Sequence, residues 1–364
     1  MKIVVTGTRG IPDIQGGVET HCEELFPLIA AHGHEVVILR RDCYISPGNV
    51  RDNFKGVRLI DIHTPRRKSL EAIVHTFRSV LRARKEKADI IHIHAIGPAL
   101  LTPLAKLLGM RVVVTHHGPD YDRDKWGFLA KTMLRFGECM GALFADRIIV
   151  ISRAIDNLLH SKYPGVRTSL IYNGVPEMEP VESISYISDL GLSSGKYIVA
   201  IGRFVKEKNF HHLIEAYAKA DLNGIKLAIA GDADHPDDYS EELKRMASEA
   251  GVVLTGFIKG GKLREIMTHA ALFVLPSSHE GLPISLLEAM SYGRDVLVSD
   301  IPANTLSELS EDDFFHVGDI EDLKCSLERK IAENRLYRKY DLSVYDWNHI
   351  AVQTINVYKE IQSK

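Results

Sequence analysis

The sequence predicts an α/β protein built from two doubly wound parallel sheets, and three observations support this fold class. The chain has 364 residues, whereas a single hydrophobic core stops growing at roughly 250 residues. Short runs rich in β-branched residues alternate with amphipathic stretches along its length. These runs are continuously apolar, as in parallel strands that helices cover on both faces. We therefore expect two sheets, each lying between layers of helices.

The strand-like runs form two sets. The first is "KIVVTG", "HEVVILR", "ADIIHIHA", "RVVVTHHG" and "DRIIVIS", and the second is "YIVAIGR", "KLAIAGD", "VVLTGF", "LFVLPS" and "DVLVSD". Between the two sets, residues 173–194 contain prolines, serines and glycines with weak periodicity, which predicts a linker. The expected domains are residues 1–175 and residues 190–344. Residues 345–364 predict an amphipathic helix with one apolar face.

The composition, 45% hydrophobic and 26% charged, is that of an ordinary globular protein. The four cysteines are scattered, without the spacing of a zinc site or a disulfide framework. The opening "MKIVVTG" lacks the features of a signal peptide, and no run of about 18 apolar residues predicts a membrane-spanning helix. We expect a cytoplasmic protein with no nucleic-acid partner.

The charges are distributed unevenly along the chain. Residues 1–180 carry 25 Lys and Arg against 19 Asp and Glu, and the remainder carries 20 against 29, which gives net charges of +6 and −9. The segment 65–87 is strongly basic and predicts a helix with Leu70, Ile73, Val74, Phe77 and Leu81 on the opposite face. Such a helix can lie on an anionic membrane surface, or it can be a sheet-covering helix with a solvated basic face. We expect the sheet to need the apolar face, which leaves only the charges to contact lipid.

Two loops of the second half carry groups that suit a phosphate ligand. In "AIGRFVKEKN" a strand ends at Gly202, and Arg203 and Lys208 lie in the loop that follows. A guanidinium and an ammonium at the carboxyl end of a parallel strand suit a phosphate, because both are permanent donors. The alternative is a surface loop whose charges face water.

The second loop, "PSSHEGLPISLLEAM", predicts a strand, a turn and a helix with a proline at its start. Free backbone N–H groups of Ile284, Ser285 and Leu286, together with the helix dipole, favour a diphosphate. Glu288 lies about one turn inside this helix and Glu280 lies on the loop before it, so both carboxylates can contact one ligand. The alternative is an acid that complements the dipole and a solvated Glu288.

The first half has a glycine-rich loop of its own, "GTRGIPDIQGG", before an amphipathic helix. It is not GxGxxG, and arginines follow the second strand where a ribose-binding site would have an acid, which disfavours a nicotinamide enzyme. His116 and His117 end another strand, where one of them could orient a substrate or share a proton, although a lone histidine is more often structural. The Asp-x-Asp triplets are expected by chance, so we predict no metal ion.

Taken together, these motifs resemble the retaining GT-B glycosyltransferases of family 4 over nearly the whole chain. The resemblance rests on "GGVE" at residues 16–19, "THHG" at 115–118, "YNGV" at 172–175, "GRFVKEKN" at 202–209 and "EGLPISLLEAM" at 280–290. It implies two Rossmann-like domains that face a cleft, with the final helix crossing back to the first domain. It also implies that the second domain binds a nucleotide-sugar, that the first binds the acceptor, and that no cofactor is needed.

The same resemblance assigns roles to individual residues. Arg203 and Lys208 match the diphosphate-binding pair of the family, and Glu288 matches its ribose-binding glutamate. Glu280 matches the glutamate that faces the donor sugar. By the same match, His117 is the histidine near the reacting carbon, and Gly17 is the glycine that lets the first loop approach the phosphates.

The expected function is the transfer, with retention, of a sugar from a nucleoside diphosphate, with UDP as the expected carrier, to a glycan acceptor. The "GTRGIP" opening and the "DRDKWG" segment resemble bacterial transferases of surface polysaccharide assembly, which usually act on lipid-linked acceptors. The alternatives are a nucleotide-sugar 2-epimerase of the same fold, a non-catalytic nucleotide-sugar-binding protein, and a transferase with a soluble acceptor. Family members often have proline in place of Asp295, so we expect a local difference there.

Overall fold

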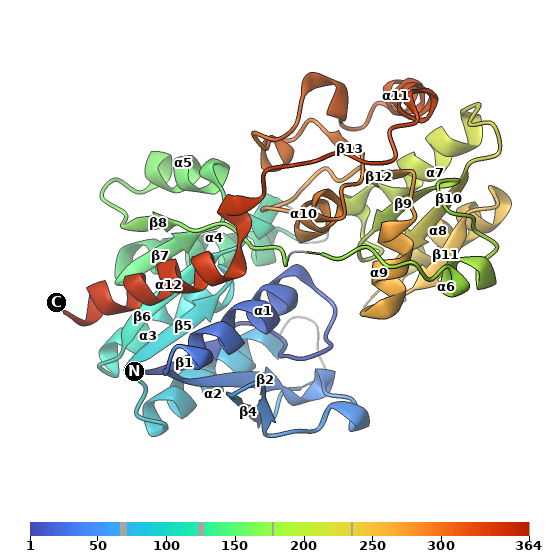
Figure 1. The fold of residues 1–364 in the computed structure, drawn as a ribbon. Coiled ribbons are helices and arrows are strands. Elements are labelled where there is room, and N and C mark those ends of the chain that lie inside the picture. The colour runs from blue at the N-terminus through green and yellow to red at the C-terminus, as the bar shows by residue number, and fades with distance from the viewer. Residues whose placement is uncertain (66–70, 123–126, 177, 234–235, 364) are drawn as a thin grey trace. The chain divides into compact units, whose positions relative to one another are not determined.

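The computed structural model describes residues 1–65, 71–122, 127–176, 178–233 and 236–363. The chain forms two compact units, of which unit 1 is Met1–Gly174 with Val344–Lys364 and unit 2 is Val175–Ser343. Each unit has a central sheet of mainly parallel strands covered by helices (Figure 1). The predicted fold class, two Rossmann-like parallel-sheet domains, is therefore confirmed.

The sheet of unit 1 has the strand order β3-β4-β2-β1-β5-β6-β7-β8, and only the short hairpin of β3 with β4 is antiparallel. Strand β5 is buried at every position, so that both of its histidines lie inside the protein. The strands are β1 (Lys2–Thr6), β2 (Glu35–Arg41), β3 (Asn53–Phe54), β4 (Val57–Ile62), β5 (Ile90–His94), β6 (Arg111–His116), β7 (Arg147–Val150) and β8 (Thr168–Leu170).

The helices of unit 1 form two groups. Helices α1 and α12 pack against each other (Figure 1), whereas α2 and α4 both pack against the short helix η3. The α-helices are α1 (Gly17–Ala31), α2 (Glu71–Lys85), α3 (Thr102–Leu107), α4 (Phe128–Phe144), α5 (Arg153–Lys162) and α12 (Trp347–Gln362). The 3-10 helices are η1 (Asp42–Tyr44), η2 (Pro47–Asn49), η3 (Pro98–Leu101), η4 (Asp120–Asp122) and η8 (Ser343–Tyr345), the last of which spans the boundary between the units.

The last helix, α12, completes the core of unit 1. Its apolar face, which includes Trp347, Ile350 and Tyr358, is buried in one cluster with residues of β1, β2 and α1. The Tyr358 hydroxyl lies 2.6 Å from Nδ1 of His92 in β5. A Cβ atom added at Gly174 would lie 2.4 Å from the Trp347 ring, so glycine is required where the indole packs. The expected return of the final helix to the first domain is confirmed.

The basic helix α2 differs from the sequence-based expectation. Phe77 and Leu81, which were expected to face the sheet, are exposed. Mostly small and polar side chains are buried instead, while Ile73 and Val74 are half-buried. The expectation that the apolar face covers the sheet is therefore wrong for Phe77 and Leu81. The buried residues of α2 are His75, Thr76, Ser79, Val80 and Ala83. Residues 66–70 of the basic segment lie outside the described residues.

Unit 2 has an entirely parallel six-stranded sheet in the order β11-β10-β9-β12-β13-β14. Its strands are β9 (Tyr197–Ile201), β10 (Lys226–Ala230), β11 (Val253–Gly256), β12 (Leu272–Leu275), β13 (Val296–Ser299) and β14 (Phe314–Phe315). Its helices are α6 (Ser185–Asp189), α7 (Phe210–Lys219), α8 (Asp238–Glu249), α9 (Gly261–Thr268), α10 (Ile284–Ser291) and α11 (Ile320–Glu333), with the 3-10 helices η5 (Lys206–Lys208), η6 (Pro302–Asn304) and η7 (Glu311–Asp313).

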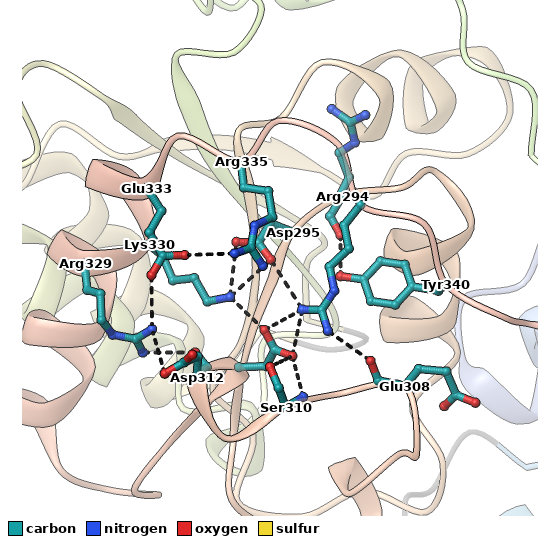
Figure 2. A network of polar contacts seen from close by, with 12 residues as sticks. Arg294, Asp295, Glu308, Ser310, Asp312, Arg329, Lys330, Glu333, Arg335 and Tyr340 are labelled. Carbon is teal, nitrogen blue, oxygen red and sulfur yellow. Dashed lines mark hydrogen bonds and ion pairs between the residues drawn. The ribbon is translucent and has the colours of Figure 1, made fainter.

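A buried charge network joins α11 to the sheet edge of unit 2 (Figure 2). Lys330 Nζ lies 3.1 Å from both carboxylate oxygens of Asp295 and 2.7 Å from Asp313 Oδ1. Arg338 also contacts both oxygens of Asp313, at 2.7 and 2.8 Å. Burial alone would raise the pKa of Asp313, but the hydrogen bonds from Lys330, Ser310 and Arg338 lower it below its ordinary value. A proline at position 295 could not accept these bonds, which explains why this chain has aspartate there.

Candidate active site

Except for His117, which follows β6, the residues predicted to bind ligand follow strands that border the point where the strand order of each sheet reverses. This point lies between β9 and β12 in unit 2 and between β1 and β5 in unit 1. Ligands of doubly wound sheets bind outside the carboxyl ends of the strands at such a point. Each unit therefore presents one candidate site, and each is described separately below.

In unit 2, the loops after β9 and β12 are tied together. Lys208 Nζ lies 2.5 Å from Glu280 Oε1, so the two predicted donor-site motifs are in direct contact. The Ser278 N–H donates to the Glu207 carbonyl oxygen at 2.9 Å, and the Asn209 side chain donates to the Pro276 carbonyl oxygen at 3.1 Å. These bonds fix the spacing of the two loops, and the ammonium and the carboxylate are held together between them.

Two glycines allow the backbones to approach closely at this site. A Cβ atom at Gly231, which has φ +141°, would lie 1.8 Å from the Gly202 carbonyl oxygen. A Cβ atom at Gly202 would lie 3.2 Å from Lys208 Cε. The Lys208 side chain therefore passes directly over Gly202 on its way to Glu280. Arg203, the next residue along the loop, is half-buried.

Helix α10 begins after Pro283 and has no side-chain cap on its N-terminus. Among the described residues, the backbone N–H groups of Ile284 and Ser285 have no hydrogen-bond acceptor, as the sequence predicts. The prediction is wrong for Leu286, because its N–H donates to the Pro283 carbonyl oxygen at 3.2 Å. A tightened first turn of a helix often satisfies a terminal donor in this way.

The accessible part of α10 is narrow. From Ile284 to Met290, only Ser285 and Glu288 are not buried, and they lie three residues apart on one face. A polar stripe thus runs from the open N-terminus of the helix to the Glu288 carboxylate. This stripe can bind an anion at one end and hydroxyl groups at the other.

In unit 1, a buried carboxylate braces the loop after β1. Glu19 Oε1 accepts hydrogen bonds from the Arg9 N–H at 2.9 Å and from the Thr8 hydroxyl at 3.2 Å. A Cβ atom at Gly7, which has φ +94°, would lie 2.1 Å from the His94 carbonyl oxygen. In contrast, a Cβ atom at Gly17 would meet no atom within 4 Å, so packing within the chain does not explain that glycine.

The two histidines at the end of β6 have different surroundings. His116 is buried, and its Nδ1 accepts the Gly118 N–H at 3.2 Å, so its proton resides on Nε2. That Nε2 lies 3.1 Å from Glu138 Oε2, which also accepts the Tyr121 hydroxyl at 2.9 Å. Burial alone would raise the pKa of Glu138, but the hydrogen bonds from His116 and Tyr121 and the charge of Lys162 lower it below its ordinary value. His116 therefore serves to hold the loop after β6.

His117 instead points toward β5. Its Nε2 lies 3.0 Å from Nδ1 of His94, and the two rings lie nearly in one plane, with centroids 5.3 Å apart and an interplanar angle of 24°. These values describe two rings joined end to end by a hydrogen bond. Burial, reinforced by neighbouring imidazoles, lowers the pKa values of both rings well below the ordinary value, so both are neutral at neutral pH. One nitrogen of the pair must therefore carry the shared proton.

The surroundings of His94 decide which ring donates. His94 Nε2 is buried and, among the described residues, has no hydrogen-bond partner. A buried N–H without an acceptor is rarer in proteins than a buried acceptor without a donor. His94 therefore carries its proton on Nδ1 and donates it to His117 Nε2. His117 in turn carries its own proton on Nδ1, the nitrogen that no described residue engages and that a ligand could accept from.

A third ring, His21 of α1, packs against the His94–His117 pair. Its Nδ1 lies 3.0 Å from Asn173 Oδ1, and burial lowers the pKa of His21 to about 4. Nitrogen atoms of the three rings lie within 4.8 Å of one another, a spacing that a metal ion could bridge. However, His94 Nδ1 and His117 Nε2 already face each other in a hydrogen bond, so a metal ion bound by these two nitrogens would have to separate the rings.

Sequence reasoning missed several members of this cluster. His21, His94 and Glu138 were not predicted as site residues, because each lies in a stretch whose pattern is typical of a buried helix or strand. A signal was present in "ADIIHIHA", since two histidines in a continuously apolar strand must be buried and need partners. In "FGECMG", a lone acid lies between glycines on an otherwise apolar helix, which also indicates a buried carboxylate.

Comparison with known proteins places the chain in a family. Residues 15–178 match the model described as Glycosyltransferase Family 4, and residues 187–341 match the model described as Glycosyl transferases group 1. The chain belongs to the family 4 glycosyltransferases. Family 4 and the GT-B fold were both predicted from the motifs, and both are confirmed.

Curated relatives of this family 4 glycosyltransferase align over most of their length. The α-maltose-1-phosphate synthase of Mycobacterium tuberculosis is 25% identical over 99% of this chain and 100% of the relative. The amylovoran biosynthesis glycosyltransferase AmsD of Erwinia amylovora is 21% identical over 82% of this chain and 81% of the relative. Both names denote transfer or synthesis, which gives the epimerase alternative no support.

Solved structures show the same fold. Sucrose-phosphate synthase from Thermosynechococcus elongatus superimposes with a TM-score of 0.83 at 21% identity, covering 100% of this chain and 99% of the other. HepE of Anabaena, in complex with UDP, superimposes with a TM-score of 0.73 at 18% identity, covering 99% of this chain and 100% of the other. At these identities the likeness establishes the GT-B fold of this glycosyltransferase.

Proposed function

We propose that this glycosyltransferase moves a sugar from a nucleoside diphosphate, UDP in the first instance, to a glycan acceptor with retention of configuration. The observation that carries the proposal is the contact between Lys208 and Glu280 at the strand-order reversal of unit 2, beside the open N-terminus of α10. A cation, a carboxylate and free backbone donors meet there, as a diphosphate joined to a sugar requires.

In the proposed reaction, the bond from the anomeric carbon to the phosphate oxygen breaks and a bond to the acceptor oxygen forms on the same face. The acceptor proton passes to the leaving diphosphate. Arg203, Lys208 and the N–H groups of Ile284 and Ser285 stabilise the charge that builds on that diphosphate, which favours the transition state over the ground state. No metal ion is needed, because these groups supply the positive charge.

The remaining predicted residues bind hydroxyl groups. Glu288, on the polar stripe of α10, accepts hydrogen bonds from the ribose, and Glu280 accepts them from the donor sugar. His117 donates its Nδ1–H to a substrate oxygen near the reacting carbon. Gly17 leaves the first loop free of a side chain, so that the backbone can approach the phosphates. Unit 1 binds the acceptor.

The choice of donor and acceptor draws on the relatives. HepE was crystallised with UDP and with UDP-glucose, AmsD is named for amylovoran biosynthesis, and a further relative, CapH of Staphylococcus aureus, is named for capsular polysaccharide biosynthesis. We infer a UDP-sugar donor and an acceptor in bacterial surface polysaccharide assembly, carried on a lipid. The enzyme then acts in the cytoplasm at the membrane, with the basic segment 65–87 facing anionic lipid.

Two measurements test this function. In a thermal-shift panel of UDP, GDP, dTDP and NAD, a nucleotide at 100 times its Kd stabilises the folded state by about 2.7 kcal/mol. A selective shift with UDP supports the donor site. A selective shift with GDP or dTDP would mean that the donor carries that nucleotide instead of UDP, and a shift with NAD alone overturns the proposal. Binding without transfer to any acceptor would favour the non-catalytic alternative.

The second measurement compares two basic residues of one loop. Arg203→Ala should slow transfer about 100-fold, by analogy with the loss of one oxyanion donor. Lys206→Ala is the matched control, because Lys206 is exposed and lies in the same loop. Equal turnover in the two variants would remove the role assigned to Arg203.

A further inference from the structure

Helix α4 of unit 1 has an inverted distribution of side chains. Its buried residues are Gly137, Glu138 and Gly141. Its largest apolar residues are exposed to solvent: Phe128 by 87%, Leu129 by 74%, Phe136 by 54% and Leu143 by 63%. A helix that covers a sheet normally buries its large apolar residues and exposes its polar ones. These four side chains of α4 therefore do not serve the core of unit 1.

The buried side of α4 explains how the helix stays attached without them. A Cβ atom at Gly137 would lie 2.2 Å from the Ile96 carbonyl oxygen, and one at Gly141 would lie 3.3 Å from Ala99 Cβ. The two glycines let α4 pack directly against the backbone around η3. Glu138 adds hydrogen bonds to His116 and Tyr121. The opposite face is thus available for another partner.

The chemistry of the exposed face is that of a membrane-binding helix. At 100° per residue, Phe128, Leu129, Phe136 and Leu143 project in neighbouring directions, and Lys131 and Arg135 lie along one edge of that face. The only acid of α4, Glu138, is buried. The Thr132 hydroxyl lies on the exposed face but donates to the Phe128 carbonyl oxygen at 2.9 Å, which lowers its need for water.

Helix α2 repeats this distribution on a smaller scale. It also packs against η3, and it exposes Phe77 and Leu81 beside the cations Arg78, Arg84 and Lys85. Two helices that share one support therefore both present apolar side chains edged by positive charge. None of the helices in the described part of the chain is long and apolar enough to cross a bilayer. These helices suit a position in the plane of the interface.

We propose that the exposed face of α4, with Phe128, Leu129, Phe136 and Leu143 inserted among lipids, docks this enzyme on an anionic bilayer. The role given to this docking rests on the proposed function, whereas the surface itself follows from where the side chains of α4 lie. A second copy of the chain is a poorer occupant. A two-fold contact would bring Lys131 and Arg135 of one copy close to the same cations of the other.

This docking would give the candidate site access to a lipid-linked acceptor. The inner side of α4 bonds through Glu138 to His116, the neighbour of His117. The end of β6 therefore lies about one helix diameter, roughly 10–12 Å, from the outer face of α4. A sugar attached to a lipid headgroup lies at that height above the apolar layer.

The test is flotation of the purified full chain with vesicles of phosphatidylcholine alone and of phosphatidylcholine with an equal part of phosphatidylglycerol. We expect binding to the anionic vesicles that weakens with added salt. Phe136→Ser with Leu143→Ser should reduce it at least tenfold, and Arg135→Gln about fivefold. Phe257→Ser is the matched control, because it removes a phenylalanine of comparable exposure, 44% against 54% for Phe136, from unit 2.

The possible results distinguish a failure of the docking proposal from a failure of the proposed transfer reaction. Thermal melting and the UDP shift show whether the double variant is folded, and transfer to a soluble acceptor analogue should remain unchanged in it. Vesicle binding without any transfer would support the docking surface and overturn the reaction. No binding by the wild type, equal binding by the double variant, or a dimer in ultracentrifugation that the double variant abolishes would each overturn the docking proposal.

Discussion

The buried charge network of unit 2 provides a sharp test of what holds α11 in place. Lys330→Met removes the ammonium that lies 3.1 Å from both Asp295 oxygens and 2.7 Å from Asp313. The side chains of all three residues are at most 1% exposed, so water cannot replace the lost donor. Arg338 still neutralises Asp313, but its contact with Asp295 is 3.8 Å long, so Asp295 loses its closest cation and keeps only a weaker ion pair.

Breaking a buried ion pair in this way costs about 3–5 kcal/mol. For a domain of this size, each kcal/mol lowers Tm by about 2–4 °C, so the transition of unit 2 should fall by roughly 6–20 °C in calorimetry. Lys324→Met on the same helix is the control, because Lys324 is partly exposed and its contact with Glu321 is 3.5 Å long. An exposed pair contributes at most about 1 kcal/mol.

The double variant Lys330→Met with Asp295→Asn sharpens the result. It removes the ammonium together with the negative charge of Asp295, which the single variant leaves with only the longer contact to Arg338, so part of the lost stability should return. If Lys330→Met costs no more than Lys324→Met, or if the second change adds a full further loss, the reasoning is refuted.

Four further predictions follow from the sites. The pKa of Glu138 is lowered below its ordinary 4.5, so the stability that its charge gives is complete above pH 4.5 and is lost as the pH falls. Urea unfolding should therefore show a larger difference in the free energy of unfolding between wild type and Glu138→Gln at pH 7 than at pH 3. His94→Asn keeps a donor at the position of Nδ1 and should retain more transfer activity than His94→Gln, and nitrogen shifts of labelled His117 should report its Nδ1–H form only in the former. Transfer should proceed at an unchanged rate in EDTA, and a loss restored by Zn²⁺ would assign a metal to the histidine cluster. Gly231→Ala, whose Cβ would lie 1.8 Å from the Gly202 carbonyl oxygen, should destabilise unit 2 by about 1–3 kcal/mol and weaken the UDP shift.

The fold could be predicted because its signals are local and repeated. Each parallel strand of a doubly wound sheet is apolar on both faces. The runs "RVVVTHHG" and "LFVLPS" can therefore be recognised as strands without knowing which strands lie beside them. The same holds for the start of α10, where a proline and a following apolar helix define a helix N-terminus. The contact between Lys208 and Glu280 could be anticipated only through the family resemblance, because 72 residues separate them.

What could not be predicted depends on which face of an element is buried. The pattern of α2 has a clear apolar side, and the usual rule assigns that side to the sheet. The structure exposes Phe77 and Leu81 instead and buries mostly small and polar residues of α2. The histidine cluster is a second case, because the partners of His94 and Glu138 come from other strands and helices. A single sequence shows no such pairing.

The return of α12 to unit 1 has a consequence for how the protein is made. Both ends of the described chain belong to unit 1, and unit 2 is inserted between Gly174 and Val344. The core of unit 1 includes Trp347, Ile350 and Tyr358, so a ribosome that has finished residue 174 has still to make the helix that closes that core. At about 5–20 residues per second, the remaining chain takes roughly 10–40 s. During that interval unit 2 can fold on the ribosome, but the apolar residues of α1 and β5 that α12 covers are still exposed. We therefore expect unit 1, rather than unit 2, to bind a chaperone during synthesis.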